Sequence, residues 1–114
     1  MQPGDFSAMH RLDGTELWHH YAGDPVRLVL LHSDGMVSRP SLGDDLEAGQ
    51  RPCVIVPEGD WMAAETEGEW SLIGTTMAPG YTQEGFELGD RDELIAAYPD
   101  AADDIVRLTR EEPA

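Results

Sequence analysis

The sequence predicts an all-β fold, a small antiparallel barrel or jelly roll, followed by two short C-terminal helices. Two observations within residues 1–80 lead to the all-β prediction. Short apolar or alternating runs recur there at about ten-residue spacing, which is typical of barrels and sandwiches. Turn-forming pairs such as Asp13-Gly14 separate these runs. A third observation predicts the helices, because the apolar residues take a helical spacing after Gly89.

Each expected strand is a run of apolar, aromatic or β-branched residues between turn signals. The run VRLVLL at 26–31 is nearly all apolar, so we expect its strand to be buried. The polar, acidic stretch 38–50 is expected to be mainly loop. Strands are expected at 6–12, 16–21, 26–31, 52–56, 61–66 and 70–77.

Two helices are expected after Gly89. Asp90 is followed three residues later by Glu93, which is the pattern of a capping box at the start of a helix over 90–98. The second helix is expected over 100–110, with acidic residues early and arginines late, as the helix dipole favours. We therefore expect one domain over 1–114, with the barrel strands in 1–80 and a C-terminal extension in 81–114.

Composition excludes several classes of function. A chain of 114 residues has room for one domain. Seven basic residues against 23 acidic ones give a net charge of −16, which disfavours nucleic acids and anionic membranes as partners. Every basic residue is arginine, so a lysine Schiff base and a phosphate-binding P-loop are both excluded. With one cysteine and no signal-peptide pattern, we expect a soluble, cytoplasmic protein.

The candidate chemistry lies between His10 and Tyr21. This segment, HRLDGTELWHHY, holds three imidazoles, two carboxylates and a phenol. In a strand over 16–21, Glu16 and Trp18 share one face, while His19 and Tyr21 share the other. The two faces cannot both line one cavity, and the alternation does not tell which one does. A histidine in a strand is also often structural, and tryptophans more often pack than bind ligands.

Several short sequence motifs resemble those of the cupin superfamily, in particular the family called cupin 5 or DUF985. Gly4, His10, Glu16 and Gly23 are spaced as in a first cupin motif. The resemblance covers nearly the whole chain. It is carried by SAMHRL at 7–12, ELWHHYAGD at 16–24, VPEGDW at 56–61, APGY at 78–81, EGFEL at 84–88 and LIAAYP at 94–99.

The resemblance implies a cupin-type antiparallel barrel with a ligand pocket at its mouth, usually as a homodimer. Metal-binding cupins use further histidines at positions that Leu12 and Met62 occupy here. His10 and Glu16 would be the remaining donors, too few to hold a divalent ion without recruiting other histidines, so we expect no metal cofactor. Members usually carry more strands before the His10 motif, so we expect either that the start of this chain is misplaced or that the barrel has an open edge that a partner chain covers.

Two functions follow as hypotheses. In the first, the protein is a metal-independent, isomerase- or epimerase-like enzyme acting on a small sugar or carbonyl substrate. Proton transfer would use His10, Glu16 and Tyr21, with the carboxylate favouring the imidazolium form of His10. In the second, the protein is a non-catalytic ligand-binding or scaffold cupin that works as a dimer. Either way, the expected ligand-binding residues are Trp18, His19, Trp61, Met62, Tyr81 and Phe86.

Overall fold

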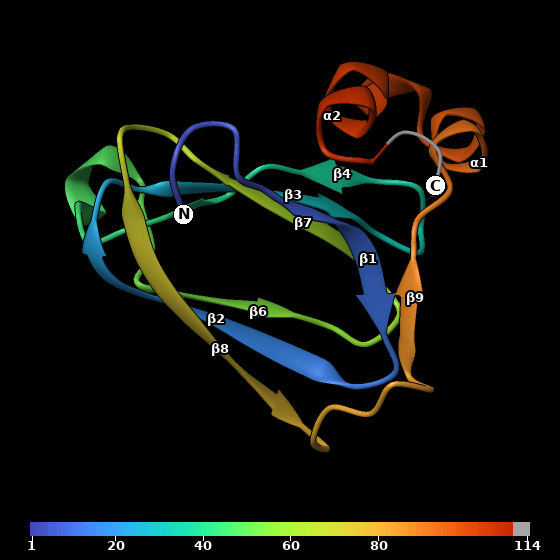
Figure 1. Cartoon of the computed structure of the whole chain (residues 1–114), viewed down its shortest axis with the longest axis horizontal. Coiled ribbons are helices and arrows are strands. Elements are labelled where there is room, and N and C mark those ends of the chain that lie inside the picture. The colour runs from blue at the N-terminus through green and yellow to red at the C-terminus, as the bar shows by residue number, and fades with distance from the viewer. Residues whose placement is uncertain (111–114) are drawn as a thin grey trace.

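Two antiparallel sheets stacked face to face make up most of the fold (Figure 1). The computed structural model describes residues 1–110. One sheet has six strands in the order β4-β3-β7-β1-β9, with β5 also paired to β3, and the other has the order β6-β2-β8. The strands are β1 (Ser7–Leu12), β2 (Thr15–Gly23), β3 (Val26–Leu31), β4 (Val37–Ser38), β5 (Ser41–Leu42), β6 (Cys53–Val56), β7 (Trp61–Thr66), β8 (Ser71–Ala78) and β9 (Phe86–Leu88).

The main core lies between the two sheets. Alternate residues of each strand point inward, so Trp18 and Val56 of the smaller sheet belong to the same buried cluster as Leu28, Leu30 and Met62 of the larger one. All five side chains are less than 5% exposed. As expected, the apolar run of β3 is buried nearly throughout, because its second face is covered as well.

Two short helices cover the outer face of the six-stranded sheet (Figure 1). They are α1 (Arg91–Ala97) and α2 (Ala102–Arg107), with short 3₁₀ turns at Leu46–Ala48 and Pro99–Ala101. The expected N-cap is present, because the Asp90 carboxylate accepts a hydrogen bond from the Glu93 backbone at 3.0 Å. Leu94 and Ile105 of the helices form a second buried cluster with Met9 and Val29 of the sheet.

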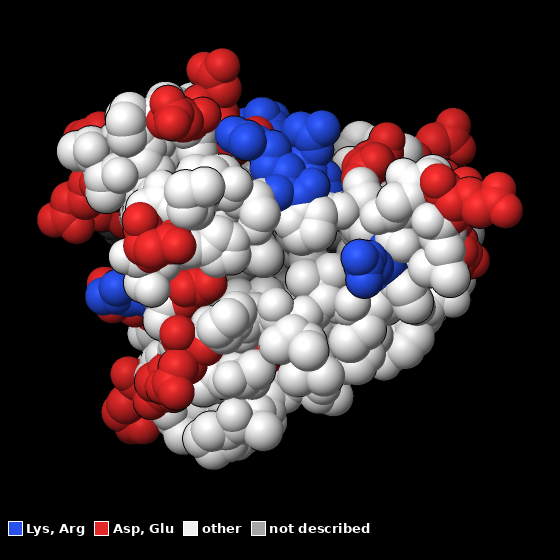
Figure 2. All heavy atoms as spheres, turned by 180° about the vertical axis from the view of Figure 1, so that it is seen from behind, with Lys and Arg blue, Asp and Glu red and all other residues white. Residues whose placement is uncertain are grey.

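The outer face of the three-stranded sheet has no such cover among the described residues. In Figure 2 the lower part of the molecule, where β2, β6 and β8 lie in Figure 1, includes a broad area without charged side chains. Acidic side chains gather at the left edge and the upper right of the same view, and a cluster of basic side chains lies at the top. The outer face of the six-stranded sheet is therefore packed against helices, whereas no described residue covers the outer face of the three-stranded sheet.

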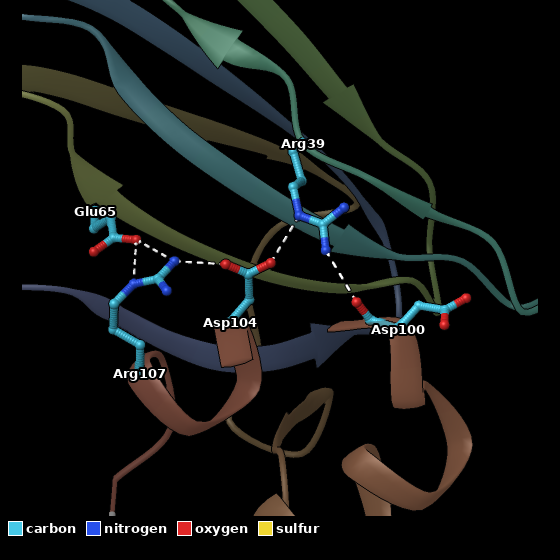
Figure 3. Close-up of polar contacts among 5 residues, drawn as sticks. All are labelled: Arg39, Glu65, Asp100, Asp104 and Arg107. Atoms are coloured by element: carbon cyan, nitrogen blue, oxygen red, sulfur yellow. Dashed lines mark hydrogen bonds and ion pairs between the residues drawn. The ribbon is translucent and has the colours of Figure 1, made fainter. Parts of the chain in front are cut away.

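An ion-pair network fastens α2 to the six-stranded sheet (Figure 3). Asp104, 6% exposed, receives hydrogen bonds from Arg39 at 2.7 Å and from Arg107 at 2.6 Å. Arg107 also binds Glu65 of β7 at 2.7 Å. Burial alone would raise the pKa of the Asp104 carboxyl, but the bonds from the two guanidinium groups outweigh it and hold that pKa below its usual value.

The structure differs from the prediction in its shortest elements. Strands β4 and β5 were not expected, and β5 lies within the segment 38–50 that we took as loop. Strand β9 falls in the region 81–114 assigned to the extension, yet it pairs with β1 and belongs to the larger sheet. Among the described residues, neither helix has the length and hydropathy needed to cross a membrane.

Candidate active site between the sheets

A cavity of about 470 Å³ lies between the two sheets. Strands β1, β2, β8 and β9 supply most of its wall, so it is bounded by the framework of the fold. Its apolar lining includes Phe6, Leu12, Trp18, Phe86 and Leu88. Its polar lining includes His10, Glu16, Thr75, Tyr81 and Arg110. An apolar pocket with a few polar groups is the usual form of a small-molecule site.

The surroundings of His10 favour its neutral imidazole form. Its ring stacks on Phe86 with centroids 5.3 Å apart, and the side chain is 9% exposed. Burial lowers the pKa of His10, and a hydrogen bond to the Ala8 carbonyl only partly opposes this. A carbonyl can only accept, so the 2.7 Å contact places the proton on Nδ1. The unprotonated Nε2 is therefore the nitrogen available as a base.

Glu16 is a largely buried side chain whose carboxyl oxygens are accessible from the cavity and have no protein partner among the described residues. It lies on β2, is 7% exposed, and makes no hydrogen bond or ion pair with any residue of the described part of the chain. Burial raises the pKa of Glu16, because the charged form is poorly solvated in the wall of the cavity. The protonated form is thus favoured more than in an exposed glutamate.

The two pKa shifts correct one sequence-based expectation. We expected the carboxylate to favour the imidazolium form of His10, which would raise its pKa. Burial has the larger effect, so the pKa of His10 falls and that of Glu16 rises. The Ala8 carbonyl, and not Glu16, selects the tautomer of His10. Each shift favours the uncharged form of its side chain, and both side chains line the cavity.

Three of the expected ligand-binding residues lie with His10 and Glu16 around the cavity. They are Trp18, Tyr81 and Phe86. Tyr81 and Phe86 meet edge to face with ring centroids 6.3 Å apart, which continues the stack that begins at His10. The Trp18 indole N–H donates to the Met62 sulfur at 3.4 Å, which fixes the ring between core and cavity. Four of the six segments that carried the resemblance, at 7–12, 16–24, 78–81 and 84–88, therefore supply residues to the cavity.

The other four expected site residues lie elsewhere. Because Glu16 and Trp18 point inward, alternation puts His19 and Tyr21 on the outer face, where their rings stack at 6.3 Å. Tyr21 is 63% exposed and cannot relay protons to His10 across the sheet. Met62 is buried in the main core and is not part of the cavity wall. Trp61 packs on the outer side of the larger sheet, beneath the guanidinium group of Arg11.

Arg110 is a cavity residue that the sequence did not indicate. Its guanidinium carbon lies 4.8 Å from the centre of the Phe6 ring, and both residues line the cavity. Arg110 follows α2 in the chain, far from the cupin words, so no sequence signal could place it beside His10. It brings a positive charge to a site on a strongly acidic protein.

A hydrogen-bonded trio around His32 was also missed. His32 contacts Asp60 through Nδ1 and Ser38 through Nε2, each at 2.6 Å. The Asp60–His32–Ser38 arrangement resembles the catalytic triad of a hydrolase, but these three residues lie outside the cavity described above. The Tyr98 hydroxyl donates to the His32 carbonyl at 2.7 Å, which joins β3 to the end of α1. We therefore assign the trio a structural role.

The donor set of the cavity does not fit a divalent metal ion. His10 Nε2 and the Glu16 carboxyl are the donors with the appropriate chemistry, and Leu12 and Met62 stand at the other two motif positions. Nowhere in residues 1–110 do three or more histidine, cysteine or acidic side chains form a metal-binding group. Catalytic zinc sites in proteins use three protein ligands.

Comparisons with known proteins show the family and the fold of the chain. A family model described as "Cupin superfamily (DUF985)" matches residues 1–89. A crystal structure from Shewanella oneidensis is 33% identical with a TM-score of 0.91, and the match covers 98% of this chain and 72% of that one. A hypothetical protein from Leishmania major is 24% identical with a TM-score of 0.88, covering 96% and 72%.

A more distant likeness shows the fold alone. A solved structure of oxalate decarboxylase from Bacillus subtilis is 11% identical with a TM-score of 0.65, and the match covers 99% of this chain and 30% of that one. No curated protein matches the chain. The family match ends at residue 89, so the two helices and Arg110 lie beyond it.

Proposed function

Because this chain belongs to the cupin superfamily, family DUF985, we propose that it binds a small polar molecule between its sheets and transfers protons on it. The proposed reaction is a metal-independent isomerisation or epimerisation of a small sugar or carbonyl compound. His10 is the base and Glu16 the acid. One observation carries the proposal: an imidazole whose pKa burial lowers and a carboxyl whose pKa burial raises, with no protein partner for its oxygens, line the same cavity.

The chemistry needs no group other than these two. His10 Nε2 removes the proton from the carbon beside the carbonyl, and the electron pair moves into a new carbon–carbon double bond. Glu16 gives its proton to the carbonyl oxygen, so a neutral enediol forms. Return of the proton from His10 to the former carbonyl carbon, with loss of the proton of the neighbouring hydroxyl to Glu16, moves the carbonyl to the adjacent carbon and restores both residues. The reaction begins with His10 unprotonated and Glu16 protonated, so that one residue can take a proton while the other gives one.

The lining supports a substrate of modest size and charge. Apolar rings of Trp18 and Phe86 offer faces to a sugar ring or carbon chain, and Tyr81 offers a hydroxyl. Arg110 can bind one anionic or strongly polar group. A nucleotide diphosphate is disfavoured by the net charge of −16. The proposal takes a homodimer as the working form and, since Cys53 is a free exposed thiol, a reducing compartment such as the cytoplasm.

Proton exchange in deuterium oxide tests the proposal. The purified protein is incubated with hydroxyacetone, glyceraldehyde and free aldoses, and loss of the proton beside the carbonyl is followed by proton NMR. We expect catalysed exchange for at least one compound. His10→Gln and Glu16→Gln should each slow it by at least about tenfold, since each removes a proton-transfer group. Glu58→Gln, a change at an exposed acid outside the cavity, should leave the rate unchanged.

Two results would speak against the proposal in different ways. If a compound binds, and His10→Gln weakens its binding, yet exchange never occurs, the cavity is a binding site without catalysis. If none of the compounds binds or exchanges, the proposed substrate class is wrong. Exchange that survives in both cavity variants would place the chemistry elsewhere in the protein.

A further inference from the structure

Among the described residues, Arg110 is the one arginine that lines the cavity between the sheets. The chain has seven basic residues against 23 acidic ones, and its net charge of −16 repels anions from most of its surface. Glu16 is the one acidic side chain in the same lining. A guanidinium group in the cavity wall therefore gives this protein a place where an anion is attracted.

The backbone that leads to Arg110 is fixed to strand β1. The backbone N–H of Met9 in β1 donates to the carbonyl of Leu108 at 2.8 Å. Thr109 is buried, and its carbonyl and its hydroxyl accept hydrogen bonds from Arg91 at 2.8 Å and 2.7 Å. The two residues before Arg110 are thus anchored, so its side chain starts from a set position beside the cavity.

The Phe6 ring supports the guanidinium group of Arg110. The ring centre lies 4.8 Å from the guanidinium carbon, and both residues line the cavity. A cation–π contact uses the face of the ring and takes up none of the N–H donors of the arginine. Arg110 is also exposed, so it lies where the cavity meets solvent. An entering anion can reach the guanidinium group there.

We propose that the ligand of this cavity carries a carboxylate that Arg110 binds, which makes the substrate a hydroxy- or oxo-carboxylic acid such as a uronic acid. The carbonyl part of this assignment rests on the proposed function. A planar guanidinium group matches a carboxylate with parallel hydrogen bonds. A phosphate monoester carries a charge of about −1.5 to −2, and the described lining has no second arginine to balance it, while the chain has no lysine.

The residues of the cavity would then divide the work. Arg110 selects the substrate by its carboxylate, and His10 and Glu16 act on the carbonyl group. Glu16 is the lining residue that could repel a carboxylate, and burial raises its pKa, which opposes a negative charge there. Arg110 is therefore a specificity-determining residue and takes no part in proton transfer.

The binding of two matched pairs of compounds tests the assignment. In each pair a carboxylate replaces a hydroxymethyl group: glucuronate against glucose, and pyruvate against hydroxyacetone. Titration calorimetry should show that the carboxylate binds at least about tenfold more tightly in one pair or both. Arg110→Gln should remove this preference and change the affinity for the neutral compound by less than about twofold. Arg110→Lys should keep part of it, because the charge remains while the planar fork is lost.

A charge-matched variant and a second measurement serve as controls. Arg51→Gln removes the same charge from an exposed residue outside the cavity lining, and the carboxylate preference should remain. Circular dichroism shows whether each variant is folded. If Arg110→Gln does not fold, the salt dependence of the unmodified protein decides, because added salt should weaken the binding of the carboxylate and not that of the neutral compound.

The outcomes separate this assignment from the proposed reaction. Equal affinity within both pairs, or no binding at all, overturns the carboxylate assignment, and exchange of protons on a neutral compound would still support the reaction. A preference that depends on Arg110 without any proton exchange supports the assignment and makes the cavity a binding site. A preference that survives Arg110→Gln overturns it. So does tighter binding of glucose 6-phosphate than of glucuronate, since the group recognised would then be a phosphate.

Discussion

Replacement of Trp18 by alanine is expected to lower the free energy of unfolding by about 3–5 kcal/mol. Trp18 is 3% exposed and belongs to the main core between the sheets. Its loss leaves a void beside an existing cavity of about 470 Å³, and the sheets are held apart by their other side chains, so the void cannot collapse fully. The Met62 sulfur also loses the indole donor. Urea unfolding followed by circular dichroism measures the change.

Trp70 provides the matched control for this substitution. It is 50% exposed and follows the turn before β8, so Trp70→Ala removes a similar area with much less burial. We expect a cost of about 1 kcal/mol or less, as for other exposed positions. Equal costs at Trp18 and Trp70 would mean that the core is not where we place it.

Asp104→Ala is expected to cost about 2 kcal/mol of unfolding free energy at neutral pH. The change removes the carboxylate that receives hydrogen bonds from Arg39 and Arg107, and bonds to charged groups contribute roughly 1.5–3 kcal/mol. The penalty stays at the lower end because the two arginine side chains are 40% and 42% exposed and can be hydrated after the change. Thermal and urea unfolding at pH 7 measure it.

The same substitution has an expected pH dependence. The pKa of Asp104 is lower in the folded protein than its usual value of 3.8. Its stabilisation is therefore complete above that value and is lost as pH falls below it toward the folded pKa. The difference between the parent protein and Asp104→Ala should shrink in acid. Asp103→Ala, one residue away and exposed, should cost little at either pH, and an equal cost there would contradict the role of the network.

The longer strands could be predicted from the sequence because periodicity is visible over six or more residues. Strands β1, β3 and β7 have six residues each, and each was expected within a residue of its position. Strands β4 and β5 have two residues and β9 has three, too few to show any alternation. They form because β3 and β1 offer them free edges, which is a property of the assembled sheet.

The sequence could indicate several of the residues that line the cavity, but it could not indicate which face of each strand points into it. The spacing of His10 and Glu16 and the cupin words indicated the residues that line the cavity. The alternation along β2 separated Trp18 from His19 and Tyr21, but only the position of the second sheet decides which face is inside. Burial of His10 and the approach of Arg110 depend on contacts between distant segments. For that reason the direction in which the pKa of His10 shifts could not be predicted from the presence of Glu16 six residues later in the sequence.

The central claim is that the cavity lowers the pKa of His10 and raises that of Glu16, so that each is biased toward its uncharged form, and a titration by NMR tests it most directly. Nitrogen and carbon labels on the two side chains report their protonation as pH is changed. We expect a midpoint below 6.5 for His10, with its proton on Nδ1 in the neutral form, and a midpoint above 4.5 for Glu16. A His10 midpoint above 6.5 together with a Glu16 midpoint below 4.5 would show a charged pair instead, and would contradict the account.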